Sequence, residues 1–142
     1  MQLSNDQIRE ILPHRYPFLL VDKITEYVPG ERAKGIKCVS ANEMQFLGHF
    51  PEKSVFPGVL ILEAMAQVGG IAILTMPEHK GKLAFLGGMK NVKFRTMVVP
   101  GDVIEIECVM TRFIGSAGIG EATAKVDGKL AASAEFTFAL GE

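Results

Sequence analysis

The chain has 142 residues, of which 48% are hydrophobic and 22% are charged, and its formal net charge is −1. This length and composition fit one compact domain, residues 1–142, that needs neither a disulfide nor a metal ion to fold. The near-zero net charge argues against a general nucleic-acid-binding protein, whose basic surface would shift the balance of charges.

The two cysteines, Cys38 and Cys108, lack the spacing of a zinc site or a redox motif, so we expect buried thiols in a reducing compartment. Residues 1–10 contain no basic stretch leading into an apolar segment, as a secretory signal would. We therefore expect a cytoplasmic protein.

The first quarter of the chain predicts a short helix followed by a β-hairpin. Ser4 and Gln7 have the spacing of a capping box, which predicts a helix of about two turns through Ile11. Residues 19–28 alternate apolar and polar side chains before a Pro-Gly pair, which predicts a strand and a turn. Residues 32–39 are a second predicted strand, paired with the first across this short connection.

Residues 59–76 predict one long helix that is apolar on nearly every side. Only Glu63, Gln67 and Thr75 have polar side chains there, so the segment lacks the polar face of an amphipathic surface helix. Its length of about 18 residues approaches that of a membrane span. Because Glu63 and Gln67 interrupt it, we expect instead a helix buried on all sides by its own protein.

The second half of the chain predicts a series of strands. They cover residues 82–87, 92–98, 103–111, 119–126 and 130–140. An Asp-Gly pair before the last of them predicts a tight hairpin. One apolar helix followed by antiparallel strands predicts an α+β fold with the sheet wrapped around the helix, because only wrapping hides the helix on every side.

Glu63 is the first candidate for function, because burying an unpaired carboxylate costs several kcal/mol. Gln67 lies one helical turn further on the same face and is expected to orient the carboxylate by a hydrogen bond. On the helix alone, a purely structural role for Glu63 in a buried ion pair stays open.

His49 is the second candidate, because it lies in a Gly- and Pro-rich loop just before the helix, and such loops place side chains at sites. A histidine and a carboxylate in an apolar environment form a pair suited to general acid and base catalysis. His79 lies in a polar turn and is expected to be an ordinary surface residue, whereas His14 is expected to be structural.

Gly58 is the third candidate, because the first amides of a helix have no partner within it and are free to bind a carbonyl oxygen. Glu63 lies about 7.5 Å further along the helix axis, and helical side chains lean back toward the N-terminus. This constellation suits removal of a proton α to a carbonyl and loss of a β substituent, which is a dehydration without a cofactor or a metal. No phosphate-binding loop, dinucleotide fingerprint or nucleophile elbow competes with it.

Three motifs carry a resemblance to a known family: LPHRYPFLLVD at residues 12–22, GHFP at 48–51, and FPGVL at 56–60 with Glu63 and Gln67 after it. With them, essentially the whole chain resembles the β-hydroxyacyl-acyl carrier protein dehydratases of the FabZ type. The resemblance implies a hot-dog fold and a dimer that is often assembled further into a trimer of dimers. It also implies dehydration of (3R)-hydroxyacyl-acyl carrier protein to the trans-2-enoyl form in fatty acid biosynthesis, with an acidic acyl carrier protein bearing acyl-phosphopantetheine as partner.

The same resemblance assigns roles to the three candidates. His49 is the catalytic histidine, Glu63 is the catalytic carboxylate supplied by the other subunit of the dimer, and Gly58 offers its amide to the thioester carbonyl. A related group that also isomerises the double bond carries Asp in place of Glu63, so Glu favours a plain dehydratase. Hot-dog thioesterases would hydrolyse the thioester but usually lack these motifs, and a non-catalytic acyl-thioester sensor would need a DNA-binding module that the short segment before the first strand does not provide.

The resemblance further implies a cis peptide bond before Pro57. The chain departs from its relatives at Ser54, where they usually carry Pro, and at Phe56, where Met is common. These departures bear on loop shape and chain-length preference rather than on the chemistry.

The acyl chain of such a substrate needs an apolar tunnel. Five apolar residues near the site are candidates to line it: Phe50, Phe56, Val59, Leu62 and Ala66. Each of them is equally suited to be an ordinary core residue.

A basic rim is expected for an acidic carrier protein, and Lys90, Lys93 and Arg95 are close together in the sequence. Lys93 and Arg95 would share one face of a strand. A solvated charged edge that blocks aggregation is the alternative explanation of these charges.

Overall fold

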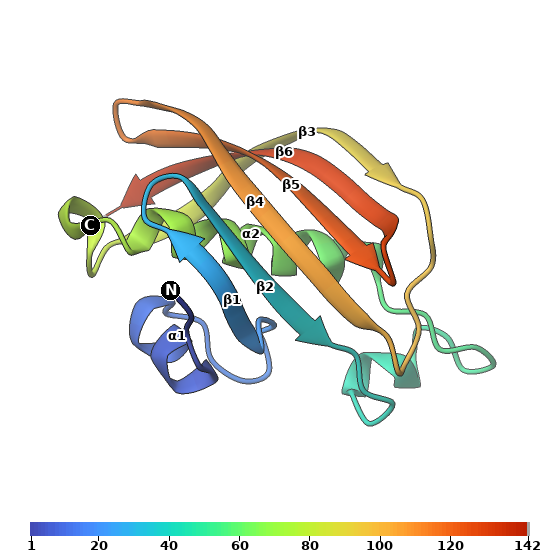
Figure 1. The fold of residues 1–142 in the computed structure, drawn as a ribbon. Helices are drawn as coiled ribbons and strands as arrows, with labels where there is room; N and C mark the ends of the chain where they lie inside the picture. The colour runs from blue at the N-terminus through green and yellow to red at the C-terminus, as the bar shows by residue number, and fades with distance from the viewer. Residues whose placement is uncertain (142) are drawn as a thin grey trace.

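An antiparallel sheet curves along one long helix (Figure 1). The computed structural model describes residues 1–141. The strand order is β1-β2-β4-β5-β6-β3, and all neighbouring strands are antiparallel. In chain order the elements are α1 (Asn5–Ile11), β1 (Lys23–Val28), β2 (Arg32–Cys38), the 3₁₀ turn η1 (Met44–Leu47), α2 (Gly58–Leu74), the 3₁₀ turn η2 (Pro77–His79), β3 (Leu83–Phe94), β4 (Val103–Ile114), β5 (Ala117–Val126) and β6 (Lys129–Gly141). The predicted α+β arrangement is confirmed.

Helix α1 begins as its sequence predicts. The Gln7 N–H donates to Ser4 Oγ at 3.3 Å and the Ser4 N–H donates to Gln7 Oε1 at 2.8 Å, which confirms the capping box. The strand predicted over residues 19–28 begins only at Lys23. The reason is that the Leu20 N–H donates to a side chain of α2 and not to a neighbouring strand.

Strand β3 replaces the two strands that were predicted over residues 82–87 and 92–98. Two irregularities in its pairing with β6 mark bulges, between Leu86 and Gly88 and between Lys90 and Lys93. Bulges let a strand continue past glycines that otherwise indicate a break. Since β3 pairs with β6 alone, it forms one edge of the sheet.

The predicted hairpin between the last two strands is confirmed. Asp127 and Gly128 have positive φ angles of 50° and 80°, and the pair Val126 and Lys129 closes the turn. Two successive positive φ angles match the twist of the flanking strands.

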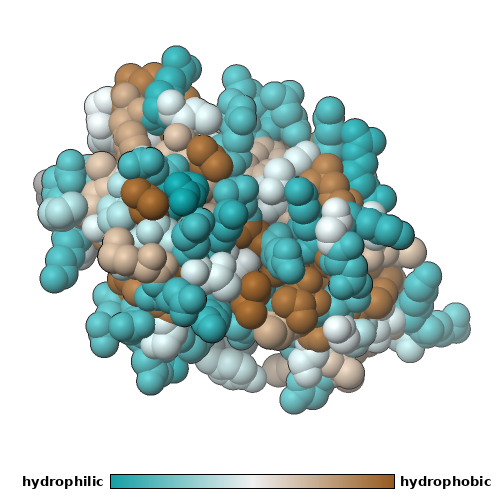
Figure 2. Space-filling view, in the orientation of Figure 1, coloured by the Kyte–Doolittle hydropathy of each residue, from teal (hydrophilic) through white to brown (hydrophobic). Residues whose placement is uncertain are grey.

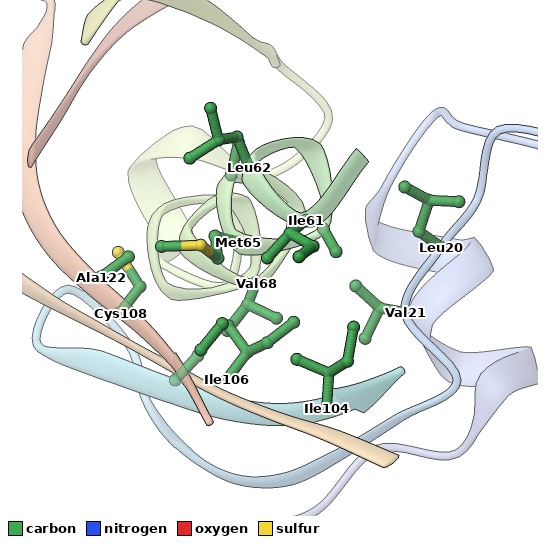
Figure 3. Close-up of a cluster of buried hydrophobic side chains, with 14 of the residues drawn as sticks. Leu20, Val21, Ile61, Leu62, Met65, Val68, Ile104, Ile106, Cys108 and Ala122 are labelled. Atoms are coloured by element: carbon green, nitrogen blue, oxygen red, sulfur yellow. The ribbon is translucent and has the colours of Figure 1, made fainter. Parts of the chain in front are cut away.

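Helix α2 is buried by the sheet rather than by lipid. Every residue from Ala64 to Leu74 is buried, and Figure 3 shows Val68 facing Ile106 of β4, with Ile61 on the side toward Val21. Within residues 1–141, no helix is long and apolar enough to span a membrane. The prediction of a helix covered on all sides by its own protein is confirmed for this segment.

Gly69 marks the closest approach between α2 and the sheet. A Cβ atom at this position would lie 2.6 Å from Phe138 Cζ on β6 and 3.0 Å from Cys108 Sγ on β4. The first distance is shorter than real Cβ contacts and the second is tight, so a side chain at position 69 would require the Phe138 ring to shift.

The two cysteines lie in different environments. Cys108 is buried as expected, and burial, with a smaller contribution from Glu107, raises the pKa of its thiol to about 12. The expectation for Cys38 is wrong, because its side chain is exposed at the end of β2, where alternate residues point away from the helix. Figure 2 shows mainly hydrophilic side chains, with hydrophobic patches between them, over the surface seen in the orientation of Figure 1.

Candidate active site

Glu63 lies on the first half of α2, and its side chain is 22% exposed. Gln67 Nε2 donates to Glu63 Oε2 at 2.9 Å, so the orienting hydrogen bond expected from the helical spacing is confirmed. His14 Nε2 lies 3.6 Å from the same oxygen. Because both contacts are to Oε2, the other carboxylate oxygen, Oε1, accepts no hydrogen bond from the described residues.

Gln67 ties this carboxylate to the segment between α1 and β1. Its side chain is 2% exposed and makes two further hydrogen bonds, from Nε2 to Phe18 O at 2.8 Å and from the Leu20 N–H to Oε1 at 2.9 Å. The amide is therefore fixed in one orientation, because both its donor and its acceptor are engaged.

His14 is a site residue whose role the sequence did not indicate. It comes from the LPHRYPFLLVD motif, stacks on Phe18 with ring centroids 6.3 Å apart, and its buried Nδ1 has no hydrogen-bond partner among the described residues. The sequence predicted a structural histidine, whereas the structure brings its ring within 3.6 Å of the Glu63 carboxyl. Its membership in the motif was the signal that could have revealed it.

A cavity of ≈ 190 Å³ opens beside this cluster. Its only polar side chains are those of His14, Glu63 and Gln67, and its apolar wall includes Phe18, Ala66, Leu74, Phe85 and Phe138. Of the five residues that the sequence predicted for a tunnel, Ala66 lines this cavity. Phe56 and Leu62 are buried in the core, while Phe50 and Val59 are 50% and 71% exposed.

His49 follows the turn η1 and is held by Val55. Its Nδ1 lies 2.6 Å from Val55 O, and the Val55 N–H donates to His49 O at 3.0 Å. A carbonyl oxygen only accepts hydrogen bonds, so Nδ1 carries a proton and Nε2 of a neutral ring is left as an acceptor. The ring also packs against Phe50 in a tilted arrangement, with centroids 3.9 Å apart.

Gly58 is the first residue of α2, and its amide has no partner within the helix. A second cavity, of ≈ 380 Å³, is lined by Gly58, Phe56, Phe94 and Arg95 among others. The implied cis bond before Pro57 is wrong: in residues 1–141 the cis bonds are Tyr16–Pro17 and His49–Phe50. The chain before Pro57 follows this trans path because the Phe56 N–H donates to Val98 O at 2.7 Å.

His49 and Glu63 have separate partners in this chain. Among the described residues, no ion pair within 4.0 Å joins them, since Glu63 contacts His14 and Gln67 while the His49 ring contacts Val55 and Phe50. Within one chain, Glu63 and His49 therefore belong to two separate clusters of residues.

The three basic residues of the predicted rim lie at the sheet edge. Lys90 forms an ion pair with Glu135 at 3.3 Å, while Lys93 and Arg95 are exposed. Arg95 lies one residue beyond the end of β3, although its N–H still donates to Ala131 O at 2.8 Å. Residues 1–141 contain no group of three or more His, Cys, Asp or Glu suited to a metal ion.

Comparisons with known proteins find relatives that cover nearly the whole chain. Residues 12–135 match the FabA-like domain family. The 3-hydroxyacyl-acyl-carrier-protein dehydratase FabZ of Clostridium botulinum strain Hall is 56% identical over 140 residues, which are 99% of this chain and 97% of that protein. The FabZ of Bacillus velezensis is 57% identical over 140 residues, 99% of each chain. A chain of the solved dehydratase heterocomplex ApeI:P from Xenorhabdus doucetiae is similar in structure, with a TM-score of 0.74 and 17% sequence identity. The match covers 95% of this chain and 91% of that one, and it confirms the hot-dog fold.

Proposed function

Because this chain belongs to the FabA-like family, and within it to the FabZ-type 3-hydroxyacyl-acyl-carrier-protein dehydratases, we propose that it removes water from a (3R)-hydroxyacyl thioester of acyl carrier protein. The product is the trans-2-enoyl thioester, an intermediate of fatty acid biosynthesis. The observation that carries this proposal is the Glu63 carboxylate, held at the wall of an apolar cavity by Gln67 and His14.

His49 and Glu63 divide the acid and base work. Nε2 of His49 takes the proton from the α carbon, and the electrons of that C–H bond form the new double bond. The bond to the β hydroxyl breaks, and this oxygen leaves as water with the proton that Oε1 of Glu63 donates. The free amide of Gly58 stabilises the charge that develops on the thioester carbonyl.

Each active site combines two chains of a dimer, with His49 from one subunit and Glu63 from the other. The separate neighbours of the two residues within one chain support this arrangement. Strand β3 supports it as well, because this edge strand leaves large apolar side chains exposed: Phe85, Leu86, Met89, Val92 and Phe94. A solitary apolar edge strand is a surface for pairing with a second copy. A trimer of dimers and a cytoplasmic location stay predictions from the sequence.

The acyl chain occupies the cavity beside Glu63, where Ala66, Leu74 and Phe138 provide apolar wall. Lys93 and Arg95 dock the acidic carrier protein, because they are exposed and without a carboxylate within 4.0 Å among the described residues. Lys90 contributes less than these two, since Glu135 already neutralises it.

Product analysis tests the function. The purified chain, given a (3R)-hydroxyacyl-acyl carrier protein, is expected to yield the enoyl thioester with the thioester bond intact. Mass spectrometry of the carrier protein then shows a loss of one water. Release of free carrier thiol would instead identify a thioesterase, and a bound but unchanged substrate would identify a non-catalytic sensor.

A further inference from the structure

The part of the chain that the structure describes contains two buried polar side chains, Gln67 and Lys37. Gln67 holds the carboxylate of the site. Lys37 lies on β2 with 8% of its surface exposed, and its Nζ donates to Glu43 Oε1 at 2.9 Å. The side chains of Lys37 and Glu43 are 10% and 18% exposed, and a largely buried ion pair often adds no stability over an apolar pair of the same volume.

Glu43 connects this lysine to the loop that carries His49. Glu43 Oε1 also accepts from Gln45 Nε2 at 2.9 Å, and Oε2 accepts from the Ser40 N–H at 2.6 Å. Burial raises the pKa of the Glu43 carboxyl, but the hydrogen bonds from Ser40, Lys37 and Gln45 outweigh it and hold the pKa below its usual value. The Glu43 carboxyl is therefore ionised at neutral pH.

Gln45 connects Glu43 to His49 by hydrogen bonds. Its carbonyl oxygen accepts from the His49 N–H at 3.0 Å and from the Gly48 N–H at 3.3 Å. The turn η1 that contains Gln45 has four residues and no side-chain hydrogen bond at its N-cap. So short a 3₁₀ turn has little stability of its own, and its contacts to Glu43 fix its position.

Lys37 also reaches the segment that leads into α2. Its Nζ lies 5.8 Å from the centroid of the Phe56 ring, a distance at which a cation attracts an aromatic face. Phe56 is 1% exposed, packs on Phe46 of η1 with centroids 6.3 Å apart, and stands two residues before Gly58. The Lys37 ammonium group thus contacts both Glu43, which holds the turn before His49, and Phe56, which precedes Gly58.

We propose that the Lys37–Glu43 pair positions His49 relative to the Gly58 amide, so that the base and the carbonyl-binding group keep one spacing through the reaction. This role rests on the proposed dehydratase function. Lys37 and Glu43 touch no substrate in this scheme and act through the loop and through Phe56.

Neutral substitutions separate positioning from stability. The variant Lys37→Met leaves Glu43 unpaired, whereas Lys37→Met with Glu43→Gln removes both charges together, so the double variant is expected to keep an unfolding midpoint close to that of the wild type. Its kcat is expected to fall about 10- to 100-fold, because misplacement by about 1 Å at a reacting group has that effect. KM is expected to stay within about twofold, since the acyl cavity is untouched.

Lys34→Met is the matched control. Lys34 lies on the same strand, but it is exposed and pairs with Glu26 and Glu107 at 3.9 and 3.8 Å, away from the site. A folded double variant with the kcat of Lys34→Met would overturn the proposal. So would a lower unfolding midpoint with unchanged kcat, because that outcome means a structural role only.

A second readout does not depend on activity. The ring nitrogen signals of His49, assigned by their loss in His49→Gln, are expected to shift in the double variant and to stay in place in Lys34→Met. If the wild-type chain had no dehydratase activity, the proposed function would be wrong. The His49 signals would still show whether the Lys37–Glu43 pair positions the ring. Unchanged signals in the double variant would contradict the positioning role.

Discussion

The two halves of the site are built in different ways. Glu63 belongs to a 17-residue helix whose residues from Ala64 to Leu74 are all buried, so its position follows from the packing of the core. His49 follows a four-residue turn, its ring makes a single hydrogen bond to Val55 O, and it packs against a half-exposed Phe50. The contrast teaches that the packing of a buried helix already positions a carboxylate on it, whereas a histidine on a loop needs anchors from elsewhere in the fold.

The largest effect is expected when either half loses its reacting group. Glu63→Gln and His49→Gln should each lower kcat by about 10²- to 10⁴-fold, because that is the usual contribution of acid and base groups. Thermal unfolding should change little, since both variants keep size and hydrogen bonding. Near-normal turnover of a folded Glu63→Gln protein would restrict Glu63 to a structural role.

The second prediction tests whether His49 and Glu63 of one active site come from different subunits. If the halves come from different chains, then co-refolded His49→Ala and Glu63→Ala subunits should recover about a quarter of wild-type activity, because half of the dimers are mixed and each holds one intact site. Each variant refolded alone is the control. No recovery in proven mixed dimers would place both residues of a site in one chain.

The third prediction concerns Gln67, which orients Glu63, and its contribution to stability. Gln67→Leu leaves the Leu20 N–H and Phe18 O without partners, so the free energy of unfolding should fall by about 1–3 kcal/mol for each group. Urea denaturation measures this loss, with Gln2→Leu at an exposed glutamine as control. A loss no larger than that of Gln2→Leu would mean that water replaces the lost bonds.

A smaller effect is expected at the sheet edge. Lys93→Glu with Arg95→Glu should raise KM for carrier-bound substrate several-fold at low salt and leave a short carrier-free thioester almost unaffected. The difference should fade with added salt, because screening acts over about 10 Å at 0.1 M. Equal losses on both substrates would indicate damage to the fold, and Lys125→Glu serves as an exposed control away from this edge.

The smallest effect concerns the two thiols. In the native protein an alkylating reagent should modify Cys38 slowly and Cys108 not at all, because burial raises both pKa values, that of Cys108 to about 12, and only Cys38 is exposed. Mass spectrometry after digestion counts the modified thiols, and unfolding in urea should make both react. Alkylation of native Cys108 would show that the core opens on the time scale of the reaction.

The helix half of the site was predictable because its contacts are local. Glu63 and Gln67 are four residues apart on one helix, a spacing that places them side by side in any helical chain. His14 escaped prediction because its contact with Glu63 depends on the path of the segment between α1 and β1, which the hydrogen bonds to Gln67 fix. Lys37 escaped for a related reason, since a lysine in an alternating strand looks exposed until its partner in the next loop is known.

The fold was predictable wherever periodicity decided it, and less so where glycines interrupted a pattern. The apolar helix and the turn at Asp127 followed directly from the sequence. Residues 82–87 and 92–98 were predicted as two strands, while in three dimensions two bulges carry β3 across the gap and the pairing with β6 continues.

Gly69 lies next to the cavity that we propose for the acyl chain, because its neighbours Gly70 and Phe138 line that cavity. The cavity beside Glu63 is bounded by Gly70 and Phe138, and the ring of Phe138 is the group that a side chain at position 69 would strike first, at 2.6 Å. Adding a single methyl group there would push the ring into the cavity or lift the helix, with Ala66 and Glu63, away from the sheet. With the acyl chain in the proposed cavity, Gly69→Ala is expected to change the range of acyl lengths accepted although it touches no reacting atom.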